Sequence, residues 1–245
     1  MKRIFIPTRS GSDWQPLLAQ PTLHWKKGAS AMTTAASWEA AIGVLPPEIS
    51  KTLDLSGSDE LRSLKLLAAF PEWEIKLDGG AATSKTDVVA ICRNDKGLCV
   101  VAIEAKVNED FGPLVKDKRK EGASPGQLAR LDYLQSLFGL PSLPDAIRYQ
   151  LLHRTASALL TARSFHAQTA VMLVQSFGQK TGLEEDFKRF SEMLDARAVS
   201  AGVYSIPTTE MPTLFLAWCQ GDPRFLQVEL PPAHVDHPLP RVLAG

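Results

Sequence analysis

One apolar segment constrains the fold of this chain more than any other. Residues 98–107 (LCVVAIEAKV) are apolar except at Glu104 and Lys106. Such a run is typical of a strand that is buried on both faces and lies centrally in a sheet. Because side chains alternate faces along a strand, Glu104 and Lys106 point the same way at its end. An ordinary buried strand would avoid both charges, so the pair requires a chemical explanation.

The residues before this strand predict an antiparallel hairpin. Residues 94–97 (NDKG) have turn chemistry, and residues 87–92 (DVVAIC) form a second strand candidate. A turn centred on the middle of NDKG puts Asp87 directly across from Glu104. Directly paired Cβ atoms lie about 4.5–5.5 Å apart, near enough for two carboxylates to share one divalent cation. A register change of a single residue would move Asp87 to the other face, so the prediction depends on this turn.

The rest of the pattern predicts an α/β or α+β protein with a mixed central sheet flanked by helices. We expect one domain over 1–245, with a core at about 33–176 and a C-terminal α/β extension at about 183–230. The proline-rich tail that follows should be extended. The expected helices are 33–45, 58–70, 127–138, 145–164 and 183–198, and the further strands are 72–77, 169–175, 201–206, 213–219 and 225–229.

Composition narrows the class of protein. The 245 residues carry 27 basic and 27 acidic side chains, so no global field attracts nucleic acid or an anionic membrane, and any basic surface must be local. The apolar run at residues 4–6 is too short for a signal peptide, and no stretch approaches the roughly 18 apolar residues of a membrane span. Three cysteines without C-x-x-C spacing suit a reducing compartment. We therefore expect a cytoplasmic protein without a membrane partner.

Two carboxylates beside a lysine fit metal-dependent hydrolysis of a phosphodiester. Asp87 and Glu104 would hold Mg²⁺ (or Mn²⁺), which polarises a phosphoryl oxygen and acidifies a water, while the ammonium group of Lys106 stabilises developing charge. The alternative is a surface ion pair on an edge strand, with Asp87 merely beginning a strand. The chain has a second E-x-K, Glu74-Ile75-Lys76, but no acid lies across a predicted hairpin from it.

This arrangement resembles the PD-(D/E)xK nuclease superfamily, which has the restriction-endonuclease-like fold. The resemblance covers roughly residues 33–175: a helix, a three-strand meander with Asp on the second strand and Glu-x-Lys on the third, then a helix and another strand. It implies that Asp87 and Glu104 are metal ligands and that Lys106 is the catalytic lysine.

The resemblance extends to a third acid and includes one departure. Members often add an acid from the first helix, and Glu39 is the candidate here for a catalytic and metal-binding residue. The position before the aspartate is Thr86, where the family pattern has proline. The superfamily also contains inactive and structural members, so a non-catalytic role stays open.

The helix expected at 145–164 carries a polar face. Gln150, His153, Arg154 and Ser157 fall on one side at helical spacing. Gln150 could join the catalytic set by binding a nucleotide or a metal-bound water, and Arg154 could bind a phosphate oxygen. A solvated outer face explains the same spacing.

Other polar residues have weaker signals. Lys118, Arg119 and Lys120 follow the proposed catalytic strand, where they could contact a nucleic-acid backbone, although a solvated loop explains them equally. His234 and His237 lie among prolines without the helical spacing of a zinc site, so we do not expect zinc there.

The sequence therefore predicts a metal-dependent nuclease that acts on nucleic acid, with DNA the first expectation. Many nucleases of the family that it resembles pair up to cut both strands, so a homodimer is part of this hypothesis. The alternative from another class is an inactive nuclease-fold module for binding or assembly. A hydrolase acting on a small phosphorylated compound is the third hypothesis, which the neutral net charge leaves open.

Overall fold

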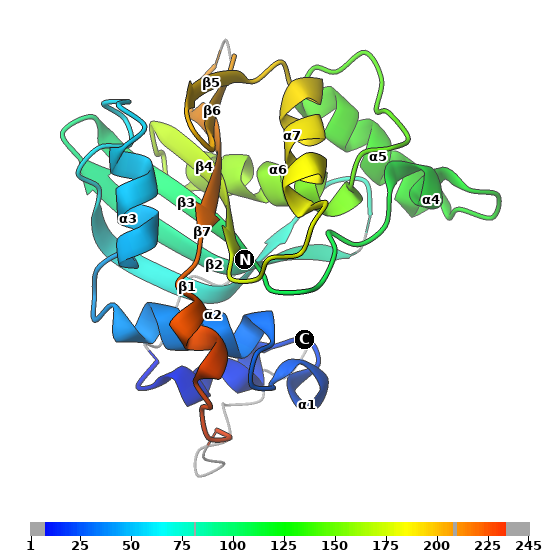
Figure 1. The fold of residues 1–245 in the computed structure, drawn as a ribbon. Coiled ribbons are helices and arrows are strands. Elements are labelled where there is room, and N and C mark those ends of the chain that lie inside the picture. Colours follow the sequence, from blue (N-terminus) through cyan, green and yellow to red (C-terminus); the bar gives the residue numbers. More distant parts are fainter. Residues whose placement is uncertain (1–7, 81, 208–209, 234–245) are drawn as a thin grey trace, which may run out of the picture.

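A mixed sheet flanked by helices organises the protein, as the sequence predicts. A computed structural model describes residues 8–80, 82–207 and 210–233, and in this part of the chain seven strands form one sheet in the order β1-β2-β3-β4-β7-β6-β5 (Figure 1). The strands are β1 (Lys65–Lys76), β2 (Thr83–Asn94), β3 (Gly97–Lys106), β4 (Thr169–Ser176), β5 (Arg197–Ser200), β6 (Val203–Ile206) and β7 (Thr213–Gln220).

Helices cover both faces of this sheet. The α-helices are α1 (Pro21–His24), α2 (Ser30–Ala40), α3 (Pro47–Asp54), α4 (Val115–Arg119), α5 (Pro125–Leu137), α6 (Tyr149–Ser164) and α7 (Leu183–Met193), and the 3₁₀ helices are η1 (Gly11–Leu17) and η2 (Pro223–Gln227). Helix α6 packs on one face, where Val100 and Ala102 join its apolar side. Helices α2 and α3 pack on the other, against Val101 and Ile103. Strand β3 is thus buried on both faces, which its apolar sequence predicted.

The predicted β2–β3 hairpin and its register are confirmed. Asn94 pairs with Gly97, and the ladder runs without interruption to Val88 opposite Ile103. The turn is held locally, because the backbone N–H of Lys96 donates to Oδ1 of Asn94 at 2.9 Å. The next positions along the two strands are Asp87 and Glu104, so the turn brings both carboxyl groups to the same end of the hairpin.

The C-terminal region completes the same sheet. Strand β7 pairs in parallel with β4, and β6 and β5 extend the sheet from β7 in antiparallel order. The predicted helix 183–198 ends earlier, at Met193, because the chain turns at Asp195 with a positive φ of 51° and then enters β5. The strand predicted at 225–229 is wrong. The first of these residues belong to η2, which begins at Pro223. The side chain of Asp222 caps this helix by accepting a hydrogen bond from the backbone N–H of Arg224.

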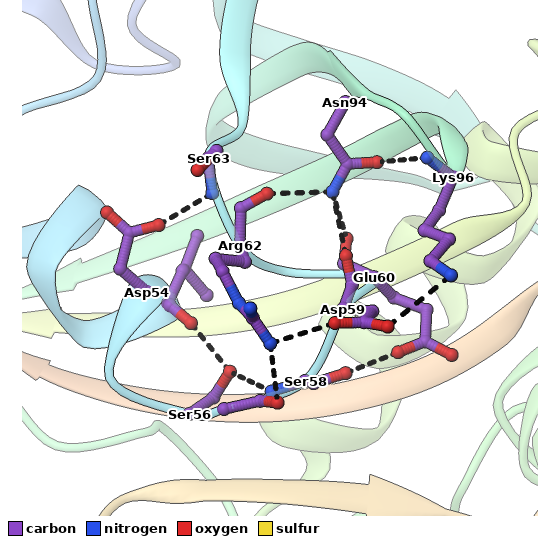
Figure 2. A network of polar contacts seen from close by, with 11 residues as sticks. Asp54, Ser56, Ser58, Asp59, Glu60, Arg62, Ser63, Asn94 and Lys96 are labelled. Carbon is purple, nitrogen blue, oxygen red and sulfur yellow. Dashed lines mark hydrogen bonds and ion pairs between the residues drawn. The ribbon is translucent and has the colours of Figure 1, made fainter.

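The helix predicted at 58–70 is also wrong, because a tertiary contact holds its first half in a turn (Figure 2). The side-chain amide of Asn94 donates to three backbone carbonyls, those of Asp59, Glu60 and Arg62, at 3.0, 3.2 and 2.9 Å. Ser63 adopts a positive φ of 55°, and its N–H donates to Asp54. The chain leaves this turn as the edge strand β1, which pairs antiparallel with β2.

Some expectations fall at the ends of the chain. His234, His237 and the apolar residues 4–6 lie outside the described residues. In the described ranges, no helix combines the length and apolar character needed to cross a bilayer. Cys92, Cys99 and Cys219 are buried free thiols in the core.

Replacing Asn94 with alanine is expected to destabilise the protein by about 1–3 kcal/mol, because three carbonyls lose their donor. Urea unfolding followed by circular dichroism measures the change. Asn108→Ala is the matched control, since Asn108 is exposed and its side chain makes no hydrogen bond within the described residues; its effect should stay within about 0.5 kcal/mol. An Asn94→Ala protein as stable as wild type would show that the turn does not depend on this side chain.

Candidate functional site

The charged pair at the end of β3 is buried. Glu104 and Lys106 are only 2% and 3% exposed, and Nζ of Lys106 donates to Oε1 of Glu104 at 2.7 Å. Strand β3 is the third of the seven, so the alternative of a surface ion pair on an edge strand is wrong. The second E-x-K lies on the outer strand β1, and there both Glu74 and Lys76 are exposed.

Helix α6 supplies two further partners for the Glu104 carboxylate. Nε2 of Gln150 donates to Oε1 at 2.7 Å, and Nε of Arg154 donates to Oε2 at 2.5 Å. Arg154 also donates through Nη1 to Oγ of Ser84, at 3.0 Å. The polar face predicted for this helix therefore turns Gln150 and Arg154 toward the site, and the solvated-face alternative does not describe these two residues.

Glu104 is ionised in this setting. Burial raises the pKa of its carboxyl, but the charges of Arg154 and Lys106 outweigh burial and hold the pKa at about 2. Burial would lower the pKa of Lys106, yet Glu104 and Asp87 together raise it. The pair is therefore a carboxylate and an ammonium group at neutral pH.

Two more carboxyl groups lie in line with Glu104, one on the adjacent strand β2 and one on β1 beyond it. Oδ2 of Asp87 accepts a hydrogen bond from the backbone N–H of Ala105 at 2.7 Å, which ties the end of β2 to β3. Glu72 on β1 lies opposite Asp87, between the pairs Pro71–Val88 and Trp73–Thr86. Three acids thus form a row across the first three strands.

Unlike Glu104, these two acids accept no hydrogen bond from a cationic side chain among the described residues. Burial, and then the charge of Glu104, raises the pKa of Asp87 to about 7. Burial, and then the charge of Asp87, raises the pKa of Glu72 to about 8, although Nζ of Lys85 lies 3.9 Å away. At neutral pH Glu72 is therefore largely protonated and Asp87 partly protonated, because burial disfavours their ionised forms more than the nearby cations favour them.

The position of Glu72 depends on a break in the side-chain alternation of β1. Phe70 and Trp73 are three residues apart, yet both pack on the α6 face, with ring centroids 5.1 Å apart. Strict alternation would put them on opposite faces. Between them, Glu72 has a positive φ of 52°, a conformation that is unfavourable for a residue with a Cβ atom. Local strain of this kind is concentrated at functional sites.

Glu72 is the site residue that the sequence analysis missed. It begins the strand predicted at 72–77, but nothing in the sequence gives the register between that strand and β2. The broken alternation also removes the period that would assign Glu72 to the face of Asp87. Its one available signal was an acid directly after Pro71, beside a buried aromatic residue.

Glu39 is not brought into this cluster. Its Oε1 accepts hydrogen bonds from Oγ1 of Thr8 at 2.8 Å and from Nε1 of Trp14 at 2.7 Å. Helix α2 packs through Trp38 into the cluster on the sheet face opposite α6. The expectation that Glu39 completes the carboxylate set therefore has no support in the contacts, and Glu72 takes that position.

The basic residues expected to contact nucleic acid are dispersed. Lys118 lies over the ring of Tyr149, with Nζ 5.1 Å from the ring centroid, close to the start of α6. Arg119 pairs with Asp145 at the surface, at 3.2 Å. Lys120 is exposed. Of the three, Lys118 is the one that lines a cavity beside the site.

The residues at the site have the chemistry to hold a hard divalent cation. Carboxylate oxygens are preferred ligands of Mg²⁺ and Mn²⁺. Oε1 of Gln150 is buried and has no hydrogen-bond partner among the described residues, so it could accept from a water. As the described side chains stand, however, no three of His, Cys, Asp or Glu are grouped so that they could hold one ion. Lys106, Gln150 and Arg154 occupy the oxygens of Glu104.

Replacing Glu72 with glutamine is expected to stabilise the protein at pH 8 when divalent metals are removed. The pKa of the Glu72 carboxyl is about 8 in the folded protein against an ordinary value of 4.5, so the folded state binds this proton more tightly. Its contribution to stability is complete below pH 4.5 and is lost as pH rises through 8. Thermal unfolding in EDTA should therefore show a higher Tm for Glu72→Gln at pH 8 and no difference near pH 4.

The matched control for this measurement is Glu74→Gln, two residues along the same strand and exposed to solvent. It should leave Tm unchanged at both pH values. A Glu72→Gln protein that melts below wild type at pH 8 would mean that the carboxylate is stabilised by its surroundings, contrary to its raised pKa.

Comparisons with known proteins place the chain in a family without describing its chemistry. No curated protein and no solved structure matches it. One family model, described as a domain of unknown function (DUF6946), matches residues 7–223 and so includes the whole sheet and the carboxylate row. Since the match spans most of the sequence, the chain belongs to the DUF6946 family.

Proposed function

We propose that the protein is a divalent-metal-dependent nuclease that hydrolyses phosphodiester bonds of nucleic acid in the cytoplasm. The observation that carries the proposal is the convergence of Asp87, Glu104 and Lys106 at one end of the β2–β3 hairpin. Gln150 and Arg154 reach the same carboxylate from α6. These are the residue types that metal-assisted phosphodiester hydrolysis requires, and they come from separate elements.

Asp87 and Glu104 would hold the metal, with Glu72 as the third acid. A bound Mg²⁺ or Mn²⁺ ion supplies Lewis-acid polarisation of a phosphoryl oxygen and a lowered pKa of bound water. The raised pKa values support this assignment, because a bound cation would stabilise the ionised forms of these two buried carboxyl groups.

The side chains around Glu104 have roles of their own. Lys106 is protonated, so it can stabilise charge on a phosphate oxygen but cannot act as a base until it loses that proton. Arg154 presents a guanidinium group suited to paired hydrogen bonds with phosphate. The unpartnered Oε1 of Gln150 can accept from the attacking water and so orient it. If Glu104 gives up one cationic partner to bind metal, Lys106 or Arg154 becomes free to pair with substrate.

The rival proposal is an inactive nuclease-fold module for binding or assembly. One observation favours it: Glu104 is already satisfied by Lys106, Gln150 and Arg154, as in a purely structural ion network. Buried charged networks of this kind can serve conformational specificity. A response to metal separates the two proposals, since a structural network needs no ion.

Mg²⁺ or Mn²⁺ is expected to raise the Tm of the wild-type protein at pH 8. A ligand that binds the folded state at about 100 times its Kd adds about 2.7 kcal/mol of stability. Asp87→Asn should abolish the response while preserving the fold, because an amide oxygen can still accept from the N–H of Ala105. Glu74→Gln should retain the full response. An unchanged wild-type Tm would favour the inactive module.

Cleavage of labelled DNA and RNA should depend on Lys106. Lys106→Met is expected to lower the rate by at least about 100-fold, because it removes a positive charge that acts on the developing charge. Its control is Lys76→Met in the exposed second E-x-K, which should cleave like wild type. Glu104→Ala is a poorer choice, since leaving Lys106 and Arg154 without their carboxylate would cost about 3–5 kcal/mol of stability. Full activity of Lys106→Met would exclude the proposed role.

A further inference from the structure

A cavity of about 380 Å³ lies directly beside the carboxylate site. Ser84 joins the two, because its Oγ accepts from Arg154 and lies 2.9 Å from Nδ1 of His153, which lines the cavity. The volume lies in the range of about 300–1,000 Å³ that is usual for small-molecule sites. The cavity lies between the start of β2, the beginnings of α5 and α6, and Lys118 of α4.

The lining of this cavity is positively charged. It includes Lys118 and Arg130 and contains no aspartate or glutamate. Arg130 is only 6% exposed, and its guanidinium group donates to the backbone carbonyls of Leu77, Asp78, Gly80 and Ala82. No carboxylate pairs with it among the described residues; besides these carbonyls it contacts the hydroxyl of Tyr149, so it adds positive charge to the cavity wall while its N–H groups stay engaged.

One wall of the cavity is aromatic. The rings of Tyr149 and His153 lie with centroids 5.0 Å apart, and Nζ of Lys118 lies 5.1 Å from the centroid of Tyr149. Burial, and then the charge of Arg154, lowers the pKa of His153 to about 3, so the imidazole is a neutral hydrogen-bonding group at pH 7. An aromatic ring beside a cation suits a planar base that carries a phosphate, if the ammonium group moves from the ring to the phosphate on binding.

We propose that this cavity binds one nucleotide, with the base against Tyr149 and the phosphate beside Lys118. Only one part of this proposal rests on the proposed function, namely that the bound nucleotide belongs to a strand that the protein cleaves. Recognition itself needs neither the metal nor the carboxylate row, because the cavity residues that carry it come from α4, α5 and α6. A nucleoside monophosphate is therefore a sufficient probe.

The test is calorimetric titration of the full chain in EDTA with deoxyadenosine 5′-monophosphate, and separately with inorganic phosphate. We expect the nucleotide to bind the wild-type protein, and Lys118→Met and Tyr149→Leu each to weaken binding by at least 10-fold. Lys116→Met is the matched control, because Lys116 lies on the same short helix, is exposed and does not line the cavity. Tyr149→Phe should bind like wild type if the ring face carries the contact.

Several results would overturn the inference. Absence of nucleotide binding would do so, as would equal binding by Lys118→Met and Lys116→Met. Equal affinity for inorganic phosphate, unaffected by Tyr149→Leu, would show a plain anion site in place of a nucleotide site. Asp87→Asn serves as the independent arm: nucleotide binding should be unchanged in this variant even if the protein proves to have no nuclease activity. Loss of binding in Asp87→Asn would place the ligand at the carboxylates and contradict the assignment.

Discussion

The arrangement of this region depends on the ion pairs and hydrogen bonds of the buried Glu104 carboxylate. An ionised group at 2% exposure costs several kcal/mol unless its oxygens are paired. Lys106, two residues along the same strand, provides one partner without any long-range packing, whereas Arg154 and Gln150 must come from α6. The charge of Glu104 on the sheet therefore requires the polar face of α6 to lie against the end of β3. At the other end of the helix, a hydrogen bond from Trp73 to Thr161 gives a second contact with the sheet.

Two further carboxyl groups in the same region have raised pKa values, because their cationic neighbours do not offset the effect of burial. Asp87 and Glu72 extend the row of acids toward the sheet edge, where Lys85 is a weak partner at 3.9 Å. Placing Glu72 there also requires a positive φ, so backbone strain and a buried carboxyl group coincide at one residue. Strained backbone conformations and strongly shifted pKa values are concentrated at functional sites. In the function proposed above, a divalent cation would stabilise the ionised carboxylates, and the adjacent basic cavity would accept an anionic substrate.

The sequence predicted the central strands β2 and β3 better than the segments around them. The turn residues 94–97 fixed the hairpin register, and the apolar run of β3 identified the central strand, because both signals are local. The helix predicted at 58–70 failed, since Asn94 holds residues 59–62 in a turn from a distant strand. Glu39 failed for a related reason: a carboxyl group on a helix gives no indication of which sheet face the helix will cover.

The sequence by itself therefore determined the mixed α/β class, the hairpin, and the placement of Asp87, Glu104 and Lys106 at one end of it. These follow from strand alternation and turn chemistry, which act over a few neighbouring residues. The tertiary structure decided that Glu72 joins them in place of Glu39, and that Arg154 and Gln150 complete the cluster. Those choices depend on β1–β2 register and helix packing, which arise only when segments distant in the sequence bury their surfaces together.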